Sequence, residues 1–175
     1  FKKRDMLYNL NLAKNFARQK KNLLICEGYM DVISLFQNNI KSVVAPLGTA
    51  FTEEQLKLSW RFTDKTTVMF DGDEAGQKAS WRAVENALPL LREDIRMSFI
   101  FLKPGDDPDS YIAENGKDAF VKLASEATSF SDYFLQSIKD HDDLSSIEGR
   151  SMVAQFAKPL VNKIANPTLK EAYTS

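Results

Sequence analysis

The sequence predicts an α/β fold, with a mostly parallel four-stranded sheet flanked by helices and an all-helical subdomain after it. Two observations support this prediction. Short apolar runs alternate with amphipathic segments up to about residue 102, which is typical of α/β units. Only helical patterns follow from residue 108 onward. The chain has 175 residues, enough for one domain with a small appendage.

The predicted elements follow from hydrophobic periodicity and from helix start signals. Thr52, followed three residues later by Gln55, forms a capping box that marks the start of a helix. The strands are predicted at Leu23–Glu27, Ser42–Ala45, Thr66–Asp71 and Met97–Leu102. The helices are predicted at Tyr29–Asn38, Glu53–Phe62, Glu74–Leu91, Pro108–Glu114, Lys117–Ala127, Phe130–Lys139 and Gly149–Ala165. We therefore expect a core over residues 22–104, followed by an acidic loop and helices over 105–175.

Charge is unevenly distributed along the chain, although the net charge is only −1. Residues 1–21 hold seven basic residues against one acidic residue, which leaves an acidic remainder. A basic arm followed by an acidic body suits a protein that grips a polyanion in one place and holds metal ions in another. Charge alone favours a solvated basic helix face equally well.

The single cysteine and the single histidine carry no chemistry in this interpretation. Cys26 lies in an apolar run, so we expect a buried strand residue, and one cysteine excludes an intramolecular disulfide. His141 lies among acidic residues and is predicted to be solvated. No apolar run approaches the ~18 residues that a membrane span needs, and nothing at the start resembles a signal peptide. The chain reads as an excised piece.

Acidic residues follow three of the predicted strands. Glu27 ends the first strand, Asp71 ends the third, and Gly105–Asp109 follows the fourth. The carboxyl ends of parallel strands share one edge of a sheet, so these side chains should converge. Clustered carboxylates repel one another unless cations neutralise them, and oxygen ligands select Mg²⁺ or Mn²⁺. Two such ions about 4 Å apart are the usual device for in-line displacement at phosphorus. The spacing predicts phosphoryl transfer.

Each acidic residue also has a plain structural interpretation. Asp73 is suited to be the N-cap of the helix that starts at Glu74. Asp107 before Pro108 is an ordinary helix start. Asp31 could be a surface charge on the first turn of its helix. Three acidic strand ends in one domain, two of them beside glycines, favour the metal site.

Four motifs, in this order and spacing, resemble the DnaG-type bacterial primases, and more broadly the TOPRIM fold shared by primases, topoisomerases and certain nucleases. The resemblance covers roughly the whole chain. The motifs are Glu27–Val32, Pro46–Thr49, Phe70–Gly76 and Lys103–Ser110.

The resemblance implies roles for individual residues. Glu27 matches a metal ligand and possible acid–base group, and Asp71 and Asp73 match the pair that holds Mg²⁺. The other matching positions would support this central group. Further metal ligands are expected at Asp31, Asp107 and Asp109, and nucleotide or DNA contacts at Lys3, Gly28, Gly72 and Lys103.

The implied reaction is attack of a 3′-hydroxyl on the α-phosphate of a ribonucleotide, with two or more Mg²⁺ or Mn²⁺ ions. The implied partners are a single-stranded DNA template, ribonucleoside triphosphates and a replicative helicase, in a monomeric protein of the bacterial cytoplasm. Residues 1–21 would be a connecting helix from a basic subdomain. That subdomain, a zinc-binding module and a helicase-docking domain are expected to be absent from this chain. The fragment should therefore bind metal but make little or no primer.

Three other hypotheses remain open. Another enzyme of the same fold, a topoisomerase or nuclease, would yield relaxed or nicked DNA instead of oligoribonucleotides. A non-catalytic DNA-binding module of this fold would fail to bind Mn²⁺. A Rossmann-like nucleotide binder lacks support, because no Gly-x-Gly-x-x-Gly follows the first strand.

Overall fold

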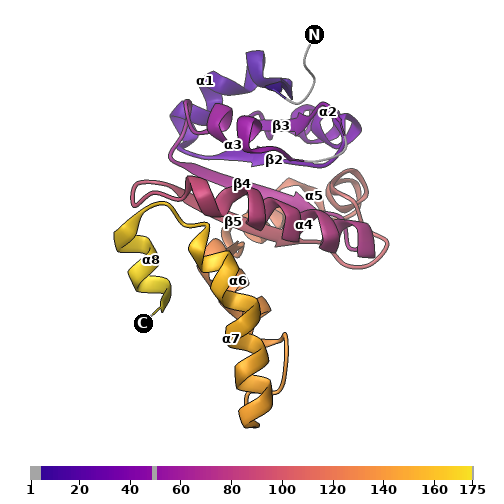
Figure 1. The fold of residues 1–175 in the computed structure, drawn as a ribbon. Helices are drawn as coiled ribbons and strands as arrows, with labels where there is room; N and C mark the ends of the chain where they lie inside the picture. The colour runs from indigo at the N-terminus through magenta and orange to yellow at the C-terminus, as the bar shows by residue number, and fades with distance from the viewer. Residues whose placement is uncertain (1–4, 49–50, 175) are drawn as a thin grey trace.

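The computed structural model describes residues 5–48 and 51–174 and contains one six-stranded sheet (Figure 1). The four central strands are parallel, and the two edge strands run antiparallel to their neighbours. In spatial order the strands are β1 (Leu7–Tyr8), β3 (Val43–Pro46), β2 (Leu23–Ile25), β4 (Lys65–Phe70), β5 (Arg96–Phe101) and β6 (Thr128–Ser129). All four predicted strands are confirmed as the centre of the sheet.

The two edge strands correct the expected four-stranded sheet. Both β1 and β6 have only two residues, too few for the alternation that reveals a strand. In β6, Thr128 pairs with Phe99 of β5. The part of the chain after residue 108 is therefore not purely helical, since it returns once to the sheet.

The observed helices lie close to the predicted ones, except that the helix expected over residues 1–21 begins at Leu10, because Leu7–Tyr8 form β1. Thr52 caps its helix by accepting a hydrogen bond from the Gln55 amide, as the capping box predicts. Gly116 has φ 79° and ψ 172°, which separates the two helical segments predicted on either side of it. One short helix, α8, was not predicted. The helices are α1 (Leu10–Lys20), α2 (Tyr29–Gln37), α3 (Glu53–Ser59), α4 (Glu74–Ala87, extended by a 3₁₀ turn over Leu88–Leu90), α5 (Pro108–Ser125), α6 (Phe130–Lys139), α7 (Ile147–Asn162) and α8 (Pro167–Thr174).

Helices cover both faces of the sheet. Alternate residues of β2 point to opposite sides, so Leu23 and Ile25 pack in one hydrophobic core while Leu24 packs in the other. The first core also contains side chains of α1, α3, α4, α6 and α7, and the second contains those of α2 and α5. Ile112 and Phe120 of α5 lie in the second core with side chains of α2, and the two helices are in contact, so α5 packs on the sheet.

A row of stacked rings connects α4 to the helices at the carboxyl end of the chain. Trp81 of α4 stacks on Phe156 of α7 with ring centroids 5.7 Å apart, and His141 stacks on Phe156 at 3.9 Å. His141 is exposed, as predicted, but it also holds the α6–α7 connection against α7. The pair α6 and α7 extends away from the sheet (Figure 1). No helix among residues 5–48 and 51–174 is both long and apolar enough to cross a membrane.

Two phenylalanines of β5 test the packing of this core. Phe99 is fully buried, whereas Phe101 is 38% exposed. We expect Phe99→Ala to lower the free energy of unfolding by about 3–5 kcal/mol, because it leaves a cavity between sheet and helices. Phe101→Ala should cost less than about 2 kcal/mol because solvent already reaches that ring. Urea unfolding of both variants measures this, and equal losses would contradict the assignment of the core.

Candidate metal centre

Two carboxylates meet at the carboxyl ends of β2 and β4. These strands are parallel neighbours, with Ile25 level with Val68, so Glu27 and Asp71 leave the sheet side by side. The Glu27 side chain reaches across, and its Oε1 accepts a hydrogen bond of 3.1 Å from the Asp71 amide. The predicted convergence of these two strand ends is thus present as a direct contact.

Backbone hydrogen bonds fix the other carboxylates. Asp31 is 8% exposed, and its Oδ2 accepts a hydrogen bond of 3.0 Å from the Gly28 amide. Asp73 caps α4, where its Oδ1 accepts from the Gly76 amide at 2.7 Å. Asp107 caps α5 in the same way. Asp73 and Asp107 fill the capping roles foreseen for them, whereas Asp31 is buried and is not the surface charge considered as its alternative. Each of the three accepts its hydrogen bond with one carboxylate oxygen.

Asp71 lies at the centre of the cluster. Its Oδ1 is buried and has no hydrogen-bond partner among the described residues. Burial is the largest cause that raises the pKa of Asp71 to about 7, and the second is the negative charge of Glu27. The charges of three further carboxylates, those of Asp31, Asp107 and Asp73, raise this pKa in the same direction.

Asp109 belongs to the same cluster, because its charge acts on Asp31. Burial raises the pKa of Asp31, and the charges of Asp107 and Asp109 add to the effect, while backbone hydrogen bonds oppose it. All six predicted acidic residues therefore gather at one edge of the sheet.

This donor set fits a hard divalent cation. Four carboxylates lie around the buried Oδ1 of Asp71, which has no partner among the described residues, and a cation would relieve both the repulsion and the missing contact. Carboxylate oxygens favour Mg²⁺ or Mn²⁺ over zinc. Within the described part of the chain, no three acidic, His or Cys side chains stand close enough to hold one ion together. The cluster is gathered but not closed around an ion, so binding requires side-chain rotation.

The residues predicted to contact nucleotide or DNA have different surroundings: the two glycines are tightly packed, and the lysine is exposed. A Cβ on Gly72 would lie 2.0 Å from the Lys103 carbonyl oxygen, so Gly72 has a packing reason to be glycine. The Lys103 side chain is exposed and makes no hydrogen bond or ion pair within the described part of the chain. A Cβ on Gly28 would come within 3.0 Å of the Asp31 carboxylate. Lys3 and Thr49 lie outside the described residues.

A cavity beside Glu27 was not foreseen from the sequence. It has a volume of about 220 Å³ and is lined by apolar side chains, including Phe51 and Phe70, with Arg82 of α4 among its walls. No sequence motif marks Arg82, because its place beside β2 depends on how α4 packs.

Cys26 lies next to Glu27 and is buried, as predicted. Burial raises the pKa of the Cys26 thiol, and the charges of Asp31, Asp71 and Glu27 raise it further.

A parallel sheet with carboxylates that converge at its carboxyl edge is the arrangement expected of the TOPRIM fold, and the comparison with known protein families gives the same class. A family model described as "Toprim-like" matches residues 24–112, about half of the chain. The chain belongs to this family.

Bacterial DNA primases are among the relatives of this chain. The chain is 41% identical to DNA primase of Pasteurella multocida over 170 residues, which is 97% of this chain and 29% of that protein. It is 37% identical to DNA primase of Escherichia coli, with the same coverage. The chain thus spans less than a third of the length of the curated relatives it matches.

Solved structures show the same likeness. A DNA primase domain from Pseudomonas aeruginosa superposes with a TM-score of 0.93 at 40% identity, covering 98% of this chain and 54% of that one. The E. coli primase catalytic core gives 0.91 at 37% identity, covering 98% and 55%. A structure described as the DnaG primase catalytic domain bound to ssDNA gives 0.87 at 35% identity, covering 98% and 56%.

A second family match corrects one expectation. A model described as "DnaB-helicase binding domain of primase" matches residues 131–175, which form most of α6 and all of α7 and α8. We expected the helicase-docking part to be absent from this chain. The helical pattern alone could not reveal it, because amphipathic helices of this kind are common to many domains.

The raised pKa of Asp71 predicts how pH affects the metal-free protein. This pKa is about 7 in the folded state and near the ordinary 3.8 in the unfolded state, so the folded state holds the proton more tightly between these values. The contribution of Asp71 to stability should therefore be lost as pH rises from about 4 to 7. In Asp71→Asn, this decrease should be smaller by roughly 1 kcal/mol, a value reduced for solvent screening.

Urea unfolding in the presence of EDTA at several pH values measures the effect. Asp118→Asn, which changes an exposed carboxylate on α5, is the matched control and should keep the pH dependence of the unmodified protein. An unchanged pH dependence in Asp71→Asn would show that Asp71 titrates normally.

Proposed function

We propose that this chain is the metal-binding part of a DNA primase, which joins ribonucleotides on a single-stranded DNA template. The observation that carries the proposal is the buried, unpartnered Oδ1 of Asp71 among four other carboxylates at the carboxyl edge of a parallel sheet. The primase names of the relatives support the choice of reaction.

Glu27, Asp71 and Asp73 would hold the ions, and Asp31, Asp107 and Asp109 would supply further ligands or negative charge around them. Two or more Mg²⁺ or Mn²⁺ ions at this place would make the attacking 3′-hydroxyl more acidic and neutralise charge on the departing pyrophosphate. The backbone hydrogen bonds to Glu27, Asp31 and Asp73 engage one oxygen of each carboxylate and keep the three side chains at this edge, so that rotation of these side chains would close the cluster around an ion.

The proposed partners are single-stranded DNA, ribonucleoside triphosphates and a replicative helicase. Support for the template comes from the related primase domain described as bound to ssDNA. Support for the helicase comes from the family match over residues 131–175. We propose that the protein acts as a monomer in the bacterial cytoplasm, with Lys3, Gly28 and Lys103 near nucleotide or DNA.

Replacing Asp71 tests the reaction. In the complete protein, Asp71→Asn should reduce template-directed synthesis of oligoribonucleotides at least about 100-fold, because metal-ion stabilisation is worth several kcal/mol and 1.36 kcal/mol is tenfold in rate. Asp118→Asn should retain activity near that of the unmodified protein. Gel analysis of labelled products measures both.

The products also decide between enzyme classes. Activity retained in Asp71→Asn would remove the central assignment. Nicked or relaxed DNA as the product of the unmodified protein would favour a nuclease or topoisomerase, and absence of Mn²⁺ binding by calorimetry would favour a non-catalytic module.

The chain alone should bind metal but make little primer. It carries the carboxylates, yet it covers only about half of each solved primase domain that it resembles. We expect Mn²⁺ binding by the 175-residue chain, with dinucleotide synthesis at least about 100-fold below that of the complete protein. Robust synthesis by the chain alone would contradict this expectation.

A further inference from the structure

Opposite charges lie at opposite edges of the sheet. The carboxylates stand at the carboxyl ends of the strands, about 20 Å from the amino ends across a six-residue strand. At the amino ends, Lys20 lies at the end of α1 just before β2, and Lys41 lies just before β3. The part of this edge next to β2 and β3 is therefore basic.

A cavity at this basic edge collects three lysines. It has a volume of about 350 Å³ and is lined by Lys20, Lys41 and Lys117, and its lining includes no acidic residue among those that the structure describes. Apolar side chains complete it, among them Phe120 and Val121 of α5, and Val121 is 51% exposed. We call these three residues and the space between them the lysine cavity.

None of these lysines is neutralised by a carboxylate of the described residues. Lys41 is held in place, because its ammonium donates to the Phe36 carbonyl at 2.9 Å and lies 3.9 Å from the centre of the Phe36 ring. Lys20 and Lys117 are exposed and form no ion pair within residues 5–48 and 51–174. Three like charges around one cavity repel one another, and an anion would relieve the repulsion.

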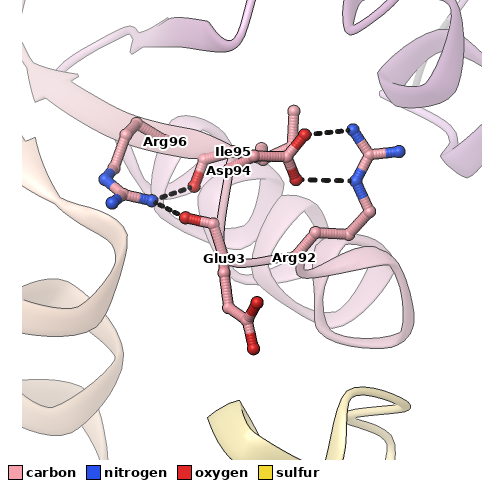
Figure 2. Close-up of polar contacts among 5 residues, drawn as sticks. All are labelled: Arg92, Glu93, Asp94, Ile95 and Arg96. Atoms are coloured by element: carbon pink, nitrogen blue, oxygen red, sulfur yellow. Dashed lines mark hydrogen bonds and ion pairs between the residues drawn. The ribbon is translucent and has the colours of Figure 1, made fainter.

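A second basic cavity at the same edge differs in this respect. It is lined by Lys57, Arg61 and Arg92. Lys57 pairs with Glu53, and Arg92 forms two hydrogen bonds to the Asp94 carboxylate (Figure 2). Here two of the three cations already have an anionic partner, whereas none of the three lysines of the lysine cavity has one among the described residues.

We propose that the lysine cavity binds the phosphate backbone of a nucleic-acid strand. This inference rests on the proposed function, in which the protein holds a template. Lysines contribute sequence-independent contacts to phosphates, while the exposed Val121 offers an apolar surface to a sugar or base. The cavity would hold the strand about 20 Å from the metal centre.

The test is the affinity of the complete protein for a labelled oligothymidylate, measured by fluorescence anisotropy at several salt concentrations. The double variant Lys20→Ala/Lys117→Ala should bind about fivefold more weakly. The slope of log affinity against log salt should fall in magnitude by about 1.4, because two single-strand phosphate contacts are lost. Lys20→Arg/Lys117→Arg should bind as the unmodified protein does.

The matched control removes the same charge elsewhere. Lys57→Ala/Lys163→Ala takes away two exposed lysines that are paired with glutamates, and it should change affinity less than twofold. Equal affinity and equal salt slope in the Lys20/Lys117 variant would overturn the proposal. So would a selective loss of binding to fluorescent ATP with unchanged oligonucleotide binding, since the cavity would then hold free nucleotides.

A further variant separates this inference from the proposed function. Asp71→Asn should keep the affinity and salt slope for the oligothymidylate, because the carboxylate edge is remote from the lysine cavity. If Asp71→Asn retains primer synthesis, the proposed function fails while the salt slope still reports on the lysines. Mn²⁺ binding by the Lys20/Lys117 variant should be unchanged, which shows that the fold is intact.

Discussion

The burial of Asp71 beside Glu27 is the constraint on which the rest of the site depends. The contact from the Asp71 amide to Glu27 joins the ends of two parallel strands, and it also brings two negative charges together where water is partly excluded. In the absence of a cation this arrangement opposes folding, as the raised pKa of Asp71 shows. The two hydrophobic cores on either side of the sheet must supply the stability that holds the charges together.

The sequence was sufficient to predict the centre of the fold but not its edges. The four central strands have apolar runs long enough to recognise, and the helix at Glu53 has a complete capping box. The strands β1 and β6 exist only because β3 and β5 offer unpaired edges to them. A two-residue strand is a product of tertiary pairing, and no local pattern can reveal it.

The sequence predicted where the carboxylate cluster lies on the sheet, but it did not predict how the side chains are arranged within it. Strand ends and glycines located Glu27 and Asp71, because the edge where they meet follows from parallel pairing alone. That Asp73 both caps α4 and lies near Asp71 requires the loop between them, which the packing of Gly72 against Lys103 fixes. The lysine cavity could not be foreseen at all, since its three residues come from segments far apart in the sequence.

The separation of charge between the two edges follows from the same connectivity. In a parallel α/β unit each helix begins where a strand ends, and acidic residues are favourable at helix amino ends. Asp31, Asp73 and Asp107 occupy the first turns or caps of their helices. Basic residues are favourable at helix carboxyl ends, where Lys20 lies. The helix dipoles therefore favour the three aspartates at one edge and Lys20 at the other. They do not account for burial of an unpartnered oxygen at one edge or for three lysines around one cavity at the other. Those two features are what point to a cation and to a phosphate.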